Sequence, residues 1–574
     1  MSKIIYITYR DEKIPDNSKE RVEQITSELN PDNIQANPSY CFQSGSNICG
    51  LSNPLSIIQT EGTNVLLGNI LNNQKNWKNP LEYYPDGNYA IFRSNTQLVE
   101  VVTDILSTRT VWYYKDDKIF ICSTSQRAII KFLSNFSFNE KVIPWIISTG
   151  SLGPLYSWDQ RIKRIPAATS LVLDISKWKL KLHSVSYDQQ NNFKTLGLKE
   201  KIYHALNNHQ INLNKWALSL SGGHDSRLIL LLLNKFKPKD KQLRTITWGT
   251  KVSHDENGTD AYIAEKLALN YNTDHSFFST KISQEPIEML LNRFLKNGEG
   301  RIDHVSSYMN GFDIWKYLFE NKYEGILRGN QLFSGLKPVS ELDIRRFMGL
   351  SLISDFENLK KHDFLNSFDQ YVPGKLERQK TENLRQYRDR ILADYRIPII
   401  QAALSDLKFP YVEQFDPLLV NSIVEEIKNT PDKQRNEKKI MKELLRALDN
   451  EIEFAKIDAT KPKEELFQQE KMVTEILKEL ESMTAQRIFP ETFLKDVKNI
   501  LEKRKNSRPT KPMNLFKRIL SSILPLKLKK KLVKSFQTSN LNPFTLGFRI
   551  LVITKMNRIL NEDADGNNTF YKLP

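Results

Sequence analysis

Serines, glycines and an aspartate lie together in the hexapeptide Ser221-Gly222-Gly223-His224-Asp225-Ser226, and this combination could bind a polyphosphate. Glycines allow the backbone to approach a phosphate closely. The serine hydroxyls can donate hydrogen bonds, and the aspartate can hold a Mg²⁺ ion that neutralises pyrophosphate. A plain glycine turn, with the aspartate or the last serine capping a helix, fits the hexapeptide alone equally well.

The segments on either side of the hexapeptide favour the phosphate site. Apolar residues precede it as in a strand and follow it with helical spacing over 228–233. A helix that begins there would present free N–H groups and the positive end of its dipole to an anion. Farther on, RTITWG (244–249) indicates a second strand, followed by a helix through 260–271. Strands that alternate with helices indicate a parallel sheet.

The first 190 residues have a different texture, with short β segments separated by turns. The pair WYYK and KIFIC flanks Asp116-Asp117, which predicts a hairpin. Short strands at this spacing predict a β-rich layered domain. The predicted strands are 4–9, 64–71, 88–94, 97–105, 111–123 and 169–175.

Composition excludes several classes of protein. A chain of 574 residues is too long for one core. Three cysteines do not suit a disulfide scaffold and fit a reducing compartment. The start of the chain lacks the apolar run of a signal peptide, and no stretch has the length of a membrane span, so we expect a soluble cytoplasmic protein.

The net charge of +16 is concentrated near the C-terminus. Between Glu502 and Glu562 the chain has 15 Lys and Arg residues and no acidic residue, so the rest is nearly neutral. A protein that binds nucleic acid through its body would spread positive charge over a working face, so we expect no nucleic-acid partner. The stretch Asn514–Phe536 is basic and amphipathic. A helix at a membrane surface and a solvated helix packed on the body both fit it.

The hexapeptide resembles the SGGxDS loop of ATP pyrophosphatases, which cleave ATP between the α- and β-phosphates and adenylate a substrate oxygen. Other segments, in the same order, resemble the asparagine synthetase family, and β-lactam synthetases and lasso-peptide cyclases are similar. Residues 1–190 resemble the family's glutaminase domain, and the resemblance extends to about residue 465. The matching segments are 68–72, 86–90, 104–114, 123–130, 247–249 with Asp260, Ala264 and His275, and 442–446.

The resemblance implies three parts. Residues 1–190 would form an α+β, layered, glutaminase-like domain of the Ntn type. Residues 195–465 would form an α/β ATP-pyrophosphatase domain with a parallel sheet. Residues 466–574 would form a helical, basic C-terminal extension.

The resemblance also implies the residues of a site for ATP and Mg²⁺. Asp225 and Asn330 would ligate the metal. Lys456, or alternatively Lys461, would stabilise the oxyanion that forms when an amine attacks the acyl-adenylate. The implied ATP-binding residues are Ser219, Ser221, Gly222, Gly223, Asp225, Ser226, Thr247, Gly249, Arg328 and Gly329.

Two departures from the family pattern change these expectations. Ser2 replaces the nucleophilic cysteine and Leu67 the oxyanion-hole asparagine, so we expect a glutaminase fold that does not hydrolyse glutamine. In the run 327–335, Asn330 replaces a metal-binding aspartate, Gln331 a glutamate and Leu327 an acidic residue. An asparagine carbonyl can ligate Mg²⁺ without charge, so the affinity should fall.

The predicted function is an ATP-dependent ligase that forms an amide through an acyl-adenylate. Its substrate would be a small-molecule or peptide carboxylate, with aspartate as the default. The amine would come from ammonia or from the substrate itself, as in a peptide cyclase. An inactive nucleotide-binding scaffold would explain the changes over 327–331, and a tRNA-modifying enzyme would explain the basic tail. The sequence does not name the carboxylate or the oligomeric state.

Overall fold

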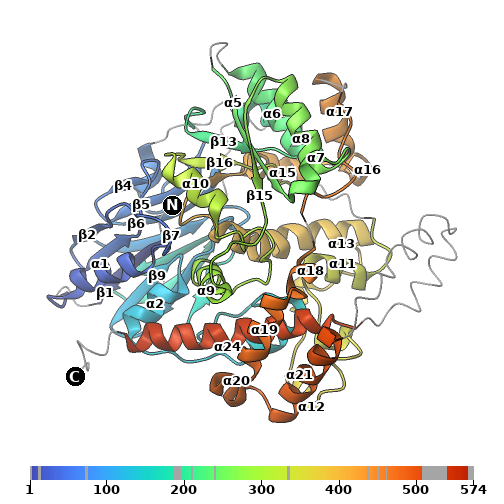
Figure 1. Ribbon diagram of the computed structural model, residues 1–574. Coiled ribbons are helices and arrows are strands. Elements are labelled where there is room, and N and C mark those ends of the chain that lie inside the picture. Colours follow the sequence, from blue (N-terminus) through green and yellow to red (C-terminus); the bar gives the residue numbers. More distant parts are fainter. Residues whose placement is uncertain are drawn as a thin grey trace.

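The protein is described by a computed structural model, shown in Figure 1. The described residues are 3–10, 14–71, 75–185, 196–207, 211–237, 241–332, 337–435, 438–448, 452–460, 462–506 and 540–566.

The N-terminal part consists of two six-stranded antiparallel sheets (Figure 1). The first has the order β10-β8-β9-β1-β3-β2, and the second β12-β11-β7-β6-β5-β4. The strands of the first are β1 (Ile4–Tyr9), β2 (Tyr40–Ser44), β3 (Asn47–Leu51), β8 (Trp112–Lys115), β9 (Ile119–Ser123) and β10 (Lys163–Arg164). Those of the second are β4 (Gln59–Glu61), β5 (Asn64–Ile70), β6 (Gly87–Ser94), β7 (Leu98–Thr103), β11 (Thr169–Asp174) and β12 (Lys179–Ser184).

Alternating side chains of β1 serve two different cores. Ile4 and Tyr6 face the second sheet, and the Tyr6 ring stacks on Phe92 with centroids 6.1 Å apart. Ile5 and Ile7 face the other way, toward α1 (Ser18–Glu28) and α2 (Gln126–Leu133). This period of two is the signature of a strand buried on both faces. It confirms the predicted layered, β-rich fold of this part of the chain.

The predicted strands are confirmed, and helices were missed between them. In the hairpin, the Asp116 carboxylate accepts from the amides of Lys118 and Ile119, which closes the turn. The helices α1, α2 and α3 (Val142–Thr149) were not predicted. In α3 every residue from Val142 to Ser148 is buried, so it has no polar face to reveal its helical period.

The second part is built on a five-stranded sheet in the order β15-β14-β13-β16-β17, and its strands are parallel, as predicted. Its strands are β13 (Trp216–Ser219), β14 (Arg244–Gly249), β15 (Asp274–Ser279), β16 (Gly325–Leu327) and β17 (Glu413–Phe415). The chain goes from β13 to β14 and β15 on one side and then returns to β16 and β17 on the other. The topological switch point therefore lies between β13 and β16, where ligands bind in such sheets.

Helices surround this sheet and connect its strands. Those between β13 and β16 are α6 (His224–Phe236), α7 (Lys251–Asp255), α8 (Asp260–Asn270), α9 (Ile287–Gly298) and α10 (Asp313–Glu320), and α5 (Leu198–Asn207) precedes β13. Before β17 lie α11 (Glu341–Met348), α12 (Asp363–Asn366), α13 (Leu384–Ile391), the π-helical segment Leu392–Gln401 and α14 (Ala402–Asp406). After it lie α15 (Asn421–Asn429), α16 (Asp432–Arg435) and α17 (Lys439–Leu448), and α17 packs on α6.

The described C-terminal part is helical, as predicted. It comprises α18 (Lys463–Phe467), α19 (Glu470–Leu480), α20 (Met483–Ile488), α21 (Glu491–Asn506) and α24 (Pro543–Asp565). Helix α24, red in Figure 1, packs on α19, α20 and α21 and also on α2 and α3. The division at 190, 195 and 465 stays a prediction, and the basic stretch Asn514–Phe536 lies outside the described residues. Among the described helices, none is long and apolar enough to cross a membrane.

Candidate functional site

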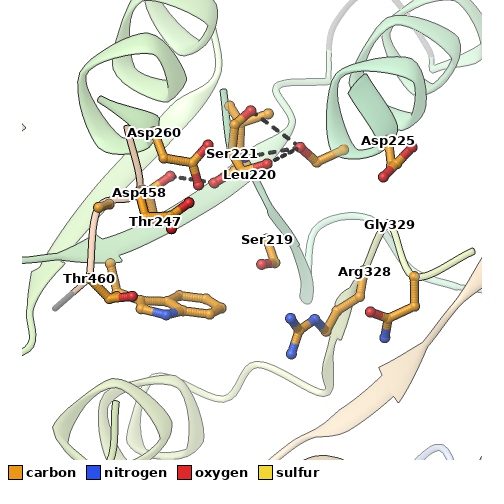
Figure 2. Close-up of a pocket in the computed structure, with 14 residues that line it drawn as sticks. Ser219, Leu220, Ser221, Asp225, Thr247, Asp260, Arg328, Gly329, Asp458 and Thr460 are labelled. Carbon is orange, nitrogen blue, oxygen red and sulfur yellow. Dashed lines mark hydrogen bonds between the residues drawn. The ribbon is translucent and has the colours of Figure 1, made fainter. Parts of the chain in front are cut away.

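A cavity of about 320 Å³ lies at the switch point of the parallel sheet (Figure 2). The carboxyl ends of β13, β14 and β16 meet there, and a segment that follows α17 closes one side. The lining residues are Ser219, Leu220, Ser221, Asp225, Ser226, Thr247, Trp248, Asp260, Arg328, Gly329, Asn330, Asp458, Ala459 and Thr460. Cavities at this position of an open α/β sheet bind ligands, and phosphates bind at the helix that begins there.

Internal hydrogen bonds hold the loop between β13 and α6 in place. The Ser226 hydroxyl accepts from the Ser221 amide (3.0 Å), and the Gly222 amide donates to Asp260 Oδ1 (2.9 Å). A Cβ on Gly222 would lie 2.6 Å from the Ala455 Cβ and 2.9 Å from that of Ile263. Gly222 is therefore needed for close packing, whereas the sequence interpretation assigned it to phosphate approach.

Asp225 lies in the first turn of α6 and is bound by a lysine from a distant segment. Its Oδ2 accepts from Lys438 Nζ at 2.5 Å and from Gln331 Nε2 at 3.5 Å. Its Oδ1 is buried and has no hydrogen-bond partner among the described residues. The carboxylate is thus partly satisfied by the protein and retains one open acceptor.

Arg328 and Asn330, which follow β16, form another side of the cavity. The Arg328 guanidinium lies 5.8 Å from the centre of the Trp248 ring, and it points into the cavity (Figure 2). Asn330 lies beside the buried Asp416 and acts to lower its pKa, which burial raises. Behind Arg328, burial and the neighbouring guanidinium hold the pKa of the Lys408 ammonium well below its ordinary value.

Two carboxylates, Asp260 and Asp458, lie across the cavity from Asp225 (Figure 2). Burial raises the pKa of Asp260, the charge of Asp458 adds to the rise, and the Gly222 amide opposes it. Asp458 reaches the cavity because its segment is attached to the phosphate loop and to β14. The Ala455 amide donates to the Gly222 carbonyl (3.1 Å), and the Thr250 amide donates to the Ala459 carbonyl (2.9 Å).

The structure brings together most of the predicted site residues. Eight of them line the cavity, namely Ser219, Ser221, Asp225, Ser226, Thr247, Arg328, Gly329 and Asn330. Gly222, Gly223 and Gly249 lie in the same loops without lining it. Lys456 does not lie in the cavity: its side chain is 79% exposed and its Nζ is 3.6 Å from Glu453. Lys461 lies outside the described residues.

Several cavity residues were missed by the sequence interpretation. Asp458 and Thr460 were not assigned to the site, and Trp248 and Asp260 were noted only as parts of matching segments. Trp248 could have been found, because it lies near the end of a predicted strand, between Thr247 and Gly249. Asp458 and Lys438 have no local signal, since folding brings their segments to the loop from more than 200 residues away.

The resemblance implies a divalent metal, and the residues present fit one poorly. In place of the family's second aspartate the chain has the neutral Asn330, and Asp225 is paired with Lys438. Within the described ranges, no three His, Cys, Asp or Glu side chains converge as a metal site. Asp225 and Asn330 as ligands therefore remain a prediction supported by the resemblance alone.

Buried ion pairs lie beside the start of β1, where the resemblance places the glutaminase site. Ser2 lies outside the described residues, and Leu67 is fully buried in the core between the two sheets. Lys3 Nζ pairs with Glu299 Oε1 at 3.2 Å, and burial lowers the pKa of Lys3. Arg109 pairs with Glu413 beside it.

One part of the chain is similar to a known protein family. The family model "Asparagine synthase" matches residues 197–296. No curated protein matches. The solved structures that match include a glutamine phosphoribosylpyrophosphate amidotransferase from B. subtilis, complexed with ADP and GMP. It is 8% identical, with 50% of this chain and 67% of that chain covered and a TM-score of 0.20. Another, described as the allosteric regulatory enzyme of purine biosynthesis, is 10% identical, with 49% and 66% covered and a TM-score of 0.20. Such low scores support no conclusion about this chain.

The family match covers β13, the phosphate loop, α6, β14, α8 and β15. These elements supply much of the cavity. The chain therefore contains an asparagine synthase-like ATP-pyrophosphatase domain.

Proposed function

We propose that this protein is an ATP-dependent ligase that forms an amide and releases AMP and pyrophosphate. The observation that carries the proposal is the cavity at the switch point, where the SGGHDS loop, the end of β14 and Arg328 converge. AMP-forming ligases of the asparagine synthase family use these parts of the fold to hold ATP. The combination of the SGGHDS loop with the strand order β15-β14-β13-β16-β17 supports a site of this family more than an unrelated nucleotide site.

The lining residues suggest how ATP would lie. The aromatic face of Trp248, with Thr247, suits the adenine at the end of β14. Ser221, Ser226 and the start of α6 suit the phosphates. Arg328 would then be the cation beside the reacting α-phosphate.

The proposed chemistry has two steps. An oxygen of the substrate carboxylate attacks the α-phosphorus, the bond from that phosphorus to the bridging oxygen breaks, and pyrophosphate leaves with the bond electrons. An amine then attacks the acyl carbon and loses a proton, and AMP leaves. Lys456, on the segment that supplies Asp458, is proposed to stabilise the oxyanion of the second step once its exposed side chain turns inward.

We propose that the amine is ammonia or an amine of the substrate itself. Ser2 and Leu67 stand where glutamine hydrolysis needs cysteine and asparagine, and the Lys3–Glu299 pair fills the adjacent junction. The protein should be incubated with ATP and aspartate, with either ammonia or glutamine, while pyrophosphate and AMP are measured. Equal rates with the two amine donors would disprove the loss of glutaminase activity.

A second candidate is a nucleotide-binding scaffold without turnover. It is favoured by one observation, the neutral Asn330 and Gln331 in the stretch where the family has carboxylates. ATP binding by calorimetry, with no AMP formed in the presence of any carboxylate and amine, would support the scaffold. AMP formation that depends on a carboxylate would exclude it.

A further inference from the structure

One lysine reaches the phosphate loop from the far side of the sequence. Lys438 Nζ lies 2.5 Å from Asp225 Oδ2, and their side chains are only 21% and 19% exposed. A hydrogen bond between two charged groups is short and strong, and partial burial protects it from screening by salt. Lys438 therefore places a positive charge beside the loop where the phosphates of ATP would lie.

The backbone of Lys438 is held in an unusual conformation. Its φ is 58°, in the left-handed region that residues with a Cβ rarely adopt. It directly precedes α17, which packs on α6, the helix that carries Asp225. Backbone conformations of this kind persist where the surrounding structure enforces them, and they are common at functional sites.

The charges around the cavity require more than one cation when a polyphosphate enters. Asp225, Asp260 and Asp458 all line it and would repel ATP. Arg328 is the only Lys or Arg among the lining residues that the structure describes. A divalent ion would normally add the remaining charge, but the second carboxylate that would hold it is replaced by Asn330.

We propose that the Lys438 ammonium group replaces the divalent cation, so that the protein binds ATP without a metal. Lys438 would neutralise Asp225 and contact the β- and γ-phosphates. A lysine serves this purpose because it is a compact point charge with three donors. The inference rests on the proposed ATP site and adds to it how the phosphates are neutralised.

Calorimetric titration of the full-length protein with ATP, in Mg²⁺ or in EDTA, tests the inference. For the wild type we expect the two dissociation constants to agree within about threefold. For Lys438→Met we expect binding in EDTA to weaken at least about tenfold, since a charge-assisted contact to phosphate is lost. Lys439→Met is the matched control, because Lys439 is 55% exposed and, among the described residues, pairs with Glu443 alone, at 3.8 Å. It should change binding less than about twofold.

Two results would overturn the inference: a wild type that binds ATP only with Mg²⁺, and a folded Lys438→Met that binds in EDTA as the wild type does. If circular dichroism shows that Lys438→Met does not fold, the variants Lys438→Arg and Lys438→Gln test the inference instead. The arginine should retain metal-free binding and the glutamine should lose it, and equal binding by both would count against the inference.

The same titrations separate this inference from the proposed function. Metal-free ATP binding without pyrophosphate release from any carboxylate would leave the inference standing and remove the ligase. Pyrophosphate release by a protein that binds ATP only with Mg²⁺ would support the ligase and remove the inference.

Discussion

Two charged regions of this protein are organised in opposite ways. At the junction between the N-terminal sheets and the parallel sheet, charges are buried in pairs: Lys3 with Glu299, Arg109 with Glu413, and Arg301 with Asp406. Each of these side chains is at most 12% exposed. In the cavity at the switch point, Arg328 forms no ion pair with a described residue, and Asp225 retains an open oxygen. Each charge at the junction is therefore paired with an opposite charge, whereas the Arg328 guanidinium in the cavity has no such partner among the described residues.

The difference shows which charges serve the fold and which are available for chemistry. A buried ion pair depends on its partner, because each charge alone would be costly to bury. Charges that face a cavity without partners depend on a ligand instead, and such groups mark functional sites. Substitutions at the junction should therefore change stability, and substitutions at the cavity should change nucleotide chemistry.

The largest effect on stability is expected from Arg109→Met at the junction. Glu413 would be left buried without its cation, which costs about 3–5 kcal/mol when one partner of a buried pair is removed. Urea unfolding followed by circular dichroism measures the loss. The double variant Arg109→Met/Glu413→Gln should recover at least half of it, because no charge is then left unpaired. A single variant within about 0.5 kcal/mol of the wild type would show that the pair contributes little.

The next largest effect is a pH dependence of the free energy of unfolding, which originates in the parallel sheet. His275 on β15 is partly buried, and desolvation lowers its pKa to about 4, with the nearby His254 acting in the same direction. The unfolded chain binds the proton from pH 6.5 downward, while the folded protein does not until about pH 4. The contribution of neutral His275 is therefore fully present above pH 6.5 and is lost as the pH falls to about 4.

At 1.36 kcal/mol per pKa unit this loss reaches about 3 kcal/mol. Urea unfolding at pH 7 and pH 5 should show the wild type losing stability and His275→Gln losing less. His183→Gln on the exposed face of β12 is the control and should behave as the wild type does. Equal pH dependence in all three proteins would exclude His275 as the source.

A smaller effect is expected from Asn330→Asp in the cavity. The new carboxylate would face the buried Asp416, so without metal the variant should be less stable by about 1–3 kcal/mol. Millimolar Mg²⁺ should restore this stability, since a second carboxylate now joins Asp225 as a ligand. Thermal melts with and without Mg²⁺ measure the restoration. If the variant responds to Mg²⁺ no more than the wild type does, residue 330 is not positioned to ligate a metal.

The sequence allowed the strands and the phosphate loop to be predicted because their signals are local. Strands such as β1 and β11 are compact apolar runs with clear ends. The hexapeptide lies between an apolar strand and an apolar helix. Helix α1 was missed because few apolar residues mark its buried face. Its sequence has only Val22 and Ile25 among polar residues.

The rest of the site could not be predicted from local sequence, because it is formed by tertiary contacts. Lys438 reaches Asp225 through the packing of α17 on α6, and neither segment contains a motif for that contact. Lys456 was predicted to be catalytic because it follows the segment 442–446, which resembles a helix of the asparagine synthetase family. Position along the chain does not determine on which side of an irregular segment a side chain emerges, and here Asp458 faces the cavity while Lys456 faces solvent.

The smallest effect on the fold is expected from Lys456→Ala, which also separates the two steps of the proposed reaction. Its 3.6 Å contact with Glu453 lies at the surface, and exposed ion pairs contribute about 0–1 kcal/mol at most. ATP–pyrophosphate exchange reports the adenylation step alone, and it should stay within about twofold of the wild type, because Lys456 does not line the ATP cavity. Amide formation should fall by about a hundredfold or more if Lys456 stabilises the oxyanion of the second step. Arg328→Met should instead lower exchange and amide formation together, because Arg328 faces the cavity itself. If Lys456→Ala forms the amide at the wild-type rate while Arg328→Met does not, Arg328 serves both steps and Lys456 is an ordinary surface residue.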